Sequence, residues 1–206
     1  MGTSRLESFS DGVIAVAITL LVLGITIPNP AKDQTLIHQL GHQWPDYAAY
    51  AVSFLTIGII WINHHAMISR LETADHSILI LNLLLLMTIG LLPFATGVMA
   101  AYLRQPQGER LAAGVYAGSF LLMSIAFATL NRHILMARAH MLSEQLPLEE
   151  RRRILARSIT GLGPYVLATA LAVLSAYASL AICAAMAAFY ALPLASGAQR
   201  RPRDPA

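Results

Sequence analysis

Charged residues are spaced unevenly along the chain, and long stretches contain no Asp, Glu, Lys or Arg. Five such stretches cover residues 12–31, 47–69, 77–103, 111–131 and 158–199. A helix needs about 20 apolar residues to cross the roughly 30 Å of membrane hydrocarbon, so the first four stretches predict one span each. The fifth has 42 residues and is long enough for two short spans with a break within 175–179. One long tilted helix followed by a re-entrant segment is the alternative for that region.

This pattern predicts an all-α integral membrane protein with six transmembrane helices per subunit, forming one domain over residues 1–199. The expected spans are residues 5–27, 47–68, 77–102, 111–131, 158–175 and 179–196. The first helix has a capping-box pattern from Ser4 to Glu7, and Pro28 and Pro30 end it after Ile27. We interpret it as a retained membrane helix, because no small-x-small cleavage site follows it.

The composition supports a membrane protein and excludes several other classes. Hydrophobic residues make up 56% of the chain and charged residues only 12%, about half the charged fraction of a soluble domain. This excludes a disordered chain, a nucleic-acid-binding module and an ordinary cytosolic enzyme. The single cysteine, Cys183, precludes an intrachain disulfide. No metalloprotease, nucleophile-elbow or phosphate-loop motif occurs. We therefore expect no enzymatic activity, cofactor, metal site or nucleic-acid partner.

The loops predict the orientation. With six spans and the N-terminus inside, the inner segments carry 11 Lys and Arg residues and the outer segments carry 3. This asymmetry fits the positive-inside rule and places both termini in the cytoplasm. The largest loop, residues 132–157, is expected to be cytoplasmic and to contain a short helix that begins near Pro147. The tail, residues 200–206, is expected to be a disordered basic segment.

Polar side chains gather at the predicted cytoplasmic end of the first three spans. Asp11 lies where the first apolar run begins, and an acid at that depth requires a partner or a function. The predicted topology brings Trp61 and His65, which share a helix face, and Asn82 to about the same depth. A buried network of these four residues with Ser10 is one interpretation. The alternative is that Asp11 faces lipid headgroups and the histidines are interfacial.

The first helix also carries an apolar stripe. At 100° per residue, Val16, Leu20 and Leu23 fall within about 60° of arc, with Thr19 at the border. From periodicity alone, contact with lipid is the ordinary interpretation of such a stripe.

The N-terminal sequence resembles a known family of membrane proteins. Residues 5–11, Arg-Leu-Glu-Ser-Phe-Ser-Asp, resemble the Arg-x-x-x-Phe-Ser-Asp signature of the transmembrane protein 175 family of potassium channels. Further similar elements follow in the family's order through the third span: Trp61-x-x-His64-His65, Asn82 and Pro93-Phe94-x-Thr96. The resemblance is to the bacterial form, which has one six-span unit.

The resemblance implies a homotetramer with the first helix lining a central pore. Val16, Thr19, Leu20 and Leu23 fall on the family's pore-lining positions, and Val16 stands where a longer side chain is often found. The motif residues Arg5, Phe9, Ser10 and Asp11 would hold the first helix against Trp61 and His65. The resemblance also implies K⁺ and other monovalent cations as permeating ions, with K⁺ preferred to Na⁺, as well as permeability to protons. It further implies a place among the lipids of a bacterial cell (inner) membrane.

Two other functions remain open from the residues alone. A proton-coupled small-solute transporter would use Asp11 and His65 as a proton relay, and a membrane scaffold would transport nothing. The titratable groups cluster at one end while the middle of the spans is apolar, which favours a channel over a transporter. No Thr-Val-Gly-Tyr-Gly loop is present, so a carbonyl-lined selectivity filter is not expected.

The orientation is directly testable. A reporter fused after residue 206 and one inserted between Pro28 and Pro45 are expected to lie on opposite sides of the membrane, with residue 206 in the cytoplasm. Alkaline phosphatase and fluorescent-protein fusions measure this. The same signal from both sites would contradict the six-span topology.

Overall fold

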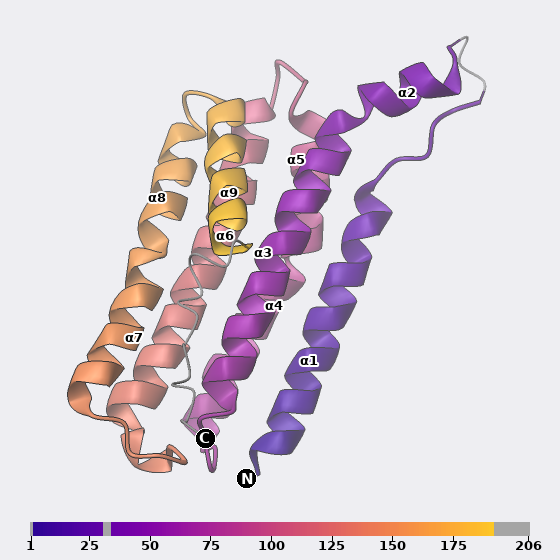
Figure 1. Cartoon of the computed structure of the whole chain (residues 1–206). Coiled ribbons are helices and arrows are strands. Elements are labelled where there is room, and N and C mark those ends of the chain that lie inside the picture. The colour runs from indigo at the N-terminus through magenta and orange to yellow at the C-terminus, as the bar shows by residue number, and fades with distance from the viewer. Residues whose placement is uncertain (1, 31–33, 192–206) are drawn as a thin grey trace, which may run out of the picture.

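The computed structural model describes residues 2–30 and 34–191, and its regular elements there are all helical (Figure 1). The all-α prediction is therefore confirmed. The elements are α1 (Thr3–Leu20), η1 (Leu21–Gly24), α2 (Leu36–His42), α3 (Trp44–Ile68), α4 (His76–Gly90), α5 (Leu92–Tyr102), α6 (Glu109–Arg132), η2 (His133–Ala137), η3 (Ala139–Met141), α7 (Leu148–Thr160), α8 (Leu162–Leu171) and α9 (Ala176–Ala191).

Several of these helices are long and apolar enough to cross a membrane. The described residues contain five such stretches, namely Thr3–Gly24, Trp44–Ile68, His76–Tyr102, Glu109–Ala137 and Leu148–Leu171. The sixth predicted span, residues 179–196, overlaps α9, which has 16 described residues. A count of six spans therefore stays a prediction. The predicted basic tail lies outside the described residues.

The first helix ends earlier than the prolines predict. It tightens into the 3₁₀ turn η1 at Leu21 and ends at Gly24, three residues before Ile27. The cause is a competing acceptor, because the backbone N–H of Thr26 donates to Oδ2 of Asp46 at 3.2 Å instead of continuing the helix. Glycine is also a poor helix former. The end of this helix is thus determined by a contact with α3.

Two boundaries in the C-terminal half also differ from those predicted. The helix expected inside the loop, α7, continues directly into α8 with only Gly161 between them, so no boundary falls at residue 158. The last break lies at residues 172–175 rather than 175–179, because α9 begins at Ala176. Ser175 caps that helix by accepting a hydrogen bond from the N–H of Ala178 at 3.2 Å.

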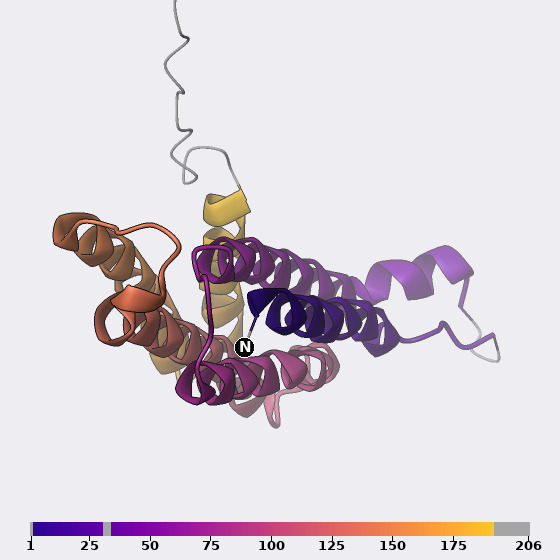
Figure 2. The same ribbon diagram turned by 90° about the horizontal axis from the view of Figure 1, so that it is seen from below.

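The bundle places α1 at one side and α7–α8 at the other (Figures 1 and 2). Helix α6 lies in the middle and packs against α4, α5, α8 and α9. Helix α1 packs mainly against α3 and α4 through a single face, which is formed by Leu6, Ser10, Ile14, Ala17 and Leu21. These residues recur every three or four positions, as one buried helix face requires.

Polar contacts connect the loops at the end of the bundle where the N-terminus lies. Asp75 caps α4 by accepting the N–H of Ile78 and also binds Nε of Arg138. These two hydrogen bonds hold the pKa of Asp75 below its usual value. The backbone N–H of Ser143 donates to the carbonyl of Arg70 at 2.9 Å, so the loop before α7 is fixed to the end of α3.

The left-handed backbone at Gly108, just before α6, can be tested by substitution. Gly108 has φ of 110°, and a Cβ there would lie 2.9 Å from Cδ1 of Tyr102. A non-glycine residue at positive φ costs roughly 1–2 kcal/mol, so Gly108→Ala is expected to lower the melting temperature in detergent. Gly163→Ala is the control, since its Cβ meets nothing within 4 Å. Equal melting of both variants and the wild type would contradict this backbone.

Candidate ion pathway and its anchors

A buried chain of hydrogen bonds joins α1 to α3 and α4. The Nδ2 group of Asn82 donates to Oγ of Ser10 at 2.9 Å, and Ser10 donates to the carbonyl of Leu6 at 2.8 Å. On its other side, Oδ1 of Asn82 lies 2.8 Å from Nε2 of His64. Ser10, His64 and Asn82 are all 0% exposed. Ser10 and Asn82 therefore meet inside the protein, as one of the two interpretations of the sequence proposes.

The directions of these bonds assign the histidine tautomer. Because the amide nitrogen of Asn82 donates to Ser10, its oxygen faces His64 and accepts, so Nε2 of His64 carries a proton. The other ring nitrogen, Nδ1, is buried with no hydrogen-bond partner among the described residues. A polar group buried in this way is costly when its remaining partner is removed, so the three side chains depend on one another.

The other predicted network members form a separate pair of contacts at the rim of the same helices. Nε1 of Trp61 donates to Oδ1 of Asp11 at 2.9 Å. His65 pairs with Glu7 at 2.7 Å rather than with Asp11. These contacts are solvent-exposed. The prediction of one buried five-residue network is therefore wrong: Ser10 and Asn82 are buried together, whereas Asp11 and Trp61 meet at the exposed rim and His65 pairs with Glu7.

Two motif residues project away from the packed face of α1. Arg5 is exposed, and Phe9 is 54% exposed. Their role in holding the helix against Trp61 and His65 stays a prediction.

The predicted pore-lining residues lie on the free face of the first span, Thr3–Gly24, which consists of α1 and its continuation η1. Val16 is 57% exposed, Leu20 44% and Leu23 76%, and Thr19 is also exposed. The free arc is wider than this stripe, because Val22 is 50% exposed as well. The hydroxyl of Thr19 donates its hydrogen to the carbonyl of Val16 at 2.8 Å, so its oxygen can still act as an acceptor.

A polar clamp holds the far end of α1, three residues beyond Leu23. Oδ2 of Asp46 accepts hydrogen bonds from the N–H and the hydroxyl of Thr26, at 3.2 and 2.9 Å. Nε2 of Gln43 lies 2.8 Å from the carbonyl of Thr26 and 2.9 Å from its hydroxyl oxygen. The backbone of Thr26 is thus held at both its donor and its acceptor by the start of α3.

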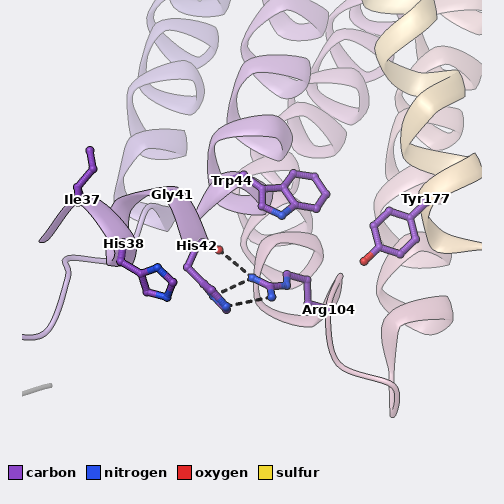
Figure 3. Close-up of a pocket in the computed structure, with 7 residues that line it drawn as sticks. All are labelled: Ile37, His38, Gly41, His42, Trp44, Arg104 and Tyr177. Atoms are coloured by element: carbon purple, nitrogen blue, oxygen red, sulfur yellow. Dashed lines mark hydrogen bonds between the residues drawn. The ribbon is translucent and has the colours of Figure 1, made fainter. Parts of the chain in front are cut away.

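His42, the residue before Gln43, lines a shallow hollow of ≈ 470 Å³ next to this clamp (Figure 3). Nη1 of Arg104 lies 2.7 Å from Nδ1 of His42 and 3.1 Å from its carbonyl oxygen. Beside them the rings of Trp44 and Tyr177 stack with centroids 6.3 Å apart. These contacts join the start of α3 to the loop after α5 and to α9.

The sequence did not predict the contact of His64 with Asn82, the pairing of Glu7 with His65, or the clamp at Thr26. Neighbouring histidines point about 100° apart on a helix, and the shared face of Trp61 and His65 directed attention to His65. Ser53, Ile57, Ile60 and His64 are spaced three or four residues apart and form one buried face of α3. The neighbouring positions of α3 are equally apolar, so the sequence does not show which face of this helix is buried. Helix α2, between the first two spans, carried too short a pattern to be predicted.

Comparison with known proteins identifies the family of the chain. Residues 5–93 match the family model described as "Endosomal/lysosomal potassium channel TMEM175". A potassium channel of Streptomyces collinus is 40% identical over 188 residues, which cover 91% of each chain. A potassium channel of Chamaesiphon minutus is 40% identical over 92% of this chain and 94% of its own. The mouse endosomal/lysosomal proton channel TMEM175 is 37% identical over 53% of this chain and 23% of its own length.

A solved structure extends the likeness to nearly the whole fold. The crystal structure of a lysosomal potassium-selective channel TMEM175 homolog from Chamaesiphon minutus superposes with a TM-score of 0.83 at 39% identity, covering 95% of this chain and 98% of that one. The resemblance noted in the sequence is thereby confirmed. The chain is a multi-pass membrane protein that belongs to the TMEM175 family, in the form represented by its bacterial members.

Proposed function

We propose that this protein is a homotetrameric cation channel that prefers K⁺, also passes protons, and conducts along a pore lined by α1. The near full-length likeness to relatives named potassium channels carries this proposal. The structure adds support, because α1 is fixed to the bundle by one face while its opposite face is apolar and exposed. One helix cannot enclose an axis, so conduction requires several copies of the chain.

In the proposed assembly, four copies of α1 surround the axis. Val16, Leu20 and Leu23 then form successive apolar rings, which act on ions by narrowness and by excluding water. The hydroxyl oxygen of Thr19 replaces part of the hydration shell of a passing cation. Leu23 is the most exposed of the three apolar residues, as a side chain projecting to the axis requires.

The anchors at the two ends of α1 keep the rings in register. The Ser10–Asn82–His64 chain fixes the rotation of the helix near its start, and the Asp46–Thr26–Gln43 clamp fixes its far end. Asp11 and His65 act here as structural partners of Trp61 and Glu7. Family membership favours this channel over a proton-coupled small-solute transporter that uses Asp11 and His65. We place the channel in the bacterial inner membrane, with both termini cytoplasmic.

Flux through purified protein in liposomes tests the function. Passive K⁺ flux that exceeds Na⁺ flux, without any imposed proton gradient, is expected of the channel. Solute uptake that requires a proton gradient, with no passive K⁺ flux, would contradict it and favour the transporter.

Shortening the proposed ring at residue 23 tests the pore face. Leu23→Ala is expected to widen the constriction in four subunits at once, giving faster K⁺ flux and weaker discrimination against Na⁺. Leu20→Ala is expected to act in the same direction, and Thr19→Val to reduce selectivity chiefly. Ion flux in liposomes measures all three.

Ile18→Ala is the matched control, since Ile18 packs against the buried core instead of the free face. It is expected to affect stability more than permeation. Unchanged rate and selectivity in Leu23→Ala, or the same permeation change in both variants, would show that the stripe does not line the pathway.

Removing Asn82 tests the anchor. Asn82→Ala leaves the buried Nε2 of His64 and Oγ of Ser10 each without this partner, at about 1–3 kcal/mol for each group. Its melting temperature is expected to fall clearly, and that of Asp11→Ala to fall less, because the Asp11 contact is exposed. Asn63→Ala is the control, since Asn63 is exposed and bonds only within its own helix. Equal melting of Asn82→Ala and Asn63→Ala would overturn the anchor.

A further inference from the structure

A positively charged groove opens at the end of the bundle where the N-terminus lies. It measures ≈ 910 Å³ and lies between the turn after α3, which provides Arg70, and one face of α7. The residues of α7 and its approach that line it are Pro147, Glu149, Glu150, Arg152, Arg153, Ile154, Ala156 and Arg157. Nothing in the proposed conduction path uses this groove.

The other face of α7 is occupied by contacts to the end of α6 and to η2. Nη1 of Arg151 donates to the carbonyl of Leu135 at 3.1 Å, and Nδ2 of Asn131 donates to Oγ of Ser158 at 2.7 Å. Arg151 and Ser158 are seven residues apart and therefore share a helix face. These two contacts fix the rotation of α7.

That rotation turns the remaining arginines of α7 away from α6. At 100° per residue, Arg152, Arg153 and Arg157 point between roughly 100° and 240° from Arg151 around the helix. All three line the groove, together with Arg70. The groove is thus formed on the side of α7 that faces away from α6.

The groove keeps its positive charge. Four arginines and two glutamates line it. Arg70, Arg152 and Arg153 take part in neither of the ion pairs that the described residues form, His65–Glu7 and Arg138–Asp75. Guanidinium groups bind phosphate through paired hydrogen bonds, so a phosphate-bearing anion is the ligand that this lining fits.

Exposed apolar side chains along α7 and α8 indicate that the phosphate belongs to a lipid. Ile159 and Val166 follow Arg152 at intervals of seven residues on the continuous helix Leu148–Leu171, and they are 51% and 52% exposed. Side chains seven apart lie on one face, so an exposed apolar stripe rises from the arginines into the membrane-spanning part. Leu167, 52% exposed, widens the stripe. A charged site below an apolar stripe matches a phospholipid, with its phosphate at the arginines and an acyl chain along the helix.

The position of the site also favours lipid. Helices α7 and α8 lie on the side of the bundle away from α1 (Figures 1 and 2). In an assembly with α1 at the axis, this side faces the membrane.

We propose that the groove formed by Arg70 and α7 binds the phosphate group of an anionic phospholipid, whose acyl chain lies along Ile159 and Val166. The site is independent of ion permeation, so its test does not require a working channel.

Native mass spectrometry of the purified protein tests the proposal, using phosphatidylglycerol and phosphatidylcholine of the same acyl chains. The protein is expected to retain phosphatidylglycerol preferentially. Arg152→Gln and Arg153→Gln are each expected to weaken that retention about fivefold. Arg110→Gln is the matched control, because it removes one exposed arginine near the start of α6, outside the groove. Unchanged retention in both groove variants, or the same loss in Arg110→Gln, would overturn the site.

Two further measurements separate the sources of phosphate and the parts of the site. Phosphatidylglycerol, but not inorganic phosphate at the same concentration, is expected to raise the melting temperature of the wild type. Equal stabilisation by inorganic phosphate would show that a soluble anion occupies the groove and would overturn the lipid proposal. Val166→Ser is expected to weaken lipid retention while leaving the arginines in place, and unchanged retention would contradict the acyl-chain contact.

Discussion

The hydrogen bond between Asn82 of α4 and Ser10 of α1 determines which face of the first helix is turned away from the bundle. Both groups are fully buried, where no water can replace a lost partner, so the bond restricts the rotation of α1 about its own axis. A rotation of one residue, about 100°, would place Asp11 in the seam and break the bond between Ser10 and Asn82. The exposed positions of Val16, Leu20 and Leu23 follow from this constraint, and the proposed pore depends on them.

The two ends of α1 are held by different chemistry. Near its start the anchor is buried and includes a histidine whose second nitrogen has no partner among the described residues. At its far end the anchor is exposed and consists of four contacts to Thr26. An exposed hydrogen bond competes with water and contributes little net stability. The far end is therefore the part of α1 that is held less firmly, and it carries Leu23, the most exposed of the predicted ring residues.

Most of the fold could be predicted from where charges are absent, because a membrane span needs about 20 uncharged residues. The absence of charged residues does not show where a helix ends when a tertiary contact determines that end. The first helix stops at Gly24 because Asp46 captures Thr26, and α7 runs into α8 because a charged helix can continue into an apolar one. The common face of Val16, Leu20 and Leu23 could be predicted, because their spacing places them on one side of a helix. The contacts of His64 and Glu7 could not, because adjacent positions of α3 are equally apolar and the sequence does not show which of the two neighbouring histidines turns inward to Asn82 and which outward to Glu7.

Cross-linking between subunits tests whether the free faces of α1 meet at a common axis. Single cysteines replace Leu23, on that free face, or Leu167, on the far side of the bundle, and the native Cys183 is fully buried. A short bismaleimide added to membranes is expected to link residue-23 cysteines into covalent dimers and to leave residue-167 cysteines monomeric. Dimers at residue 167 with none at residue 23 would show that α1 lies at the periphery and would contradict the account.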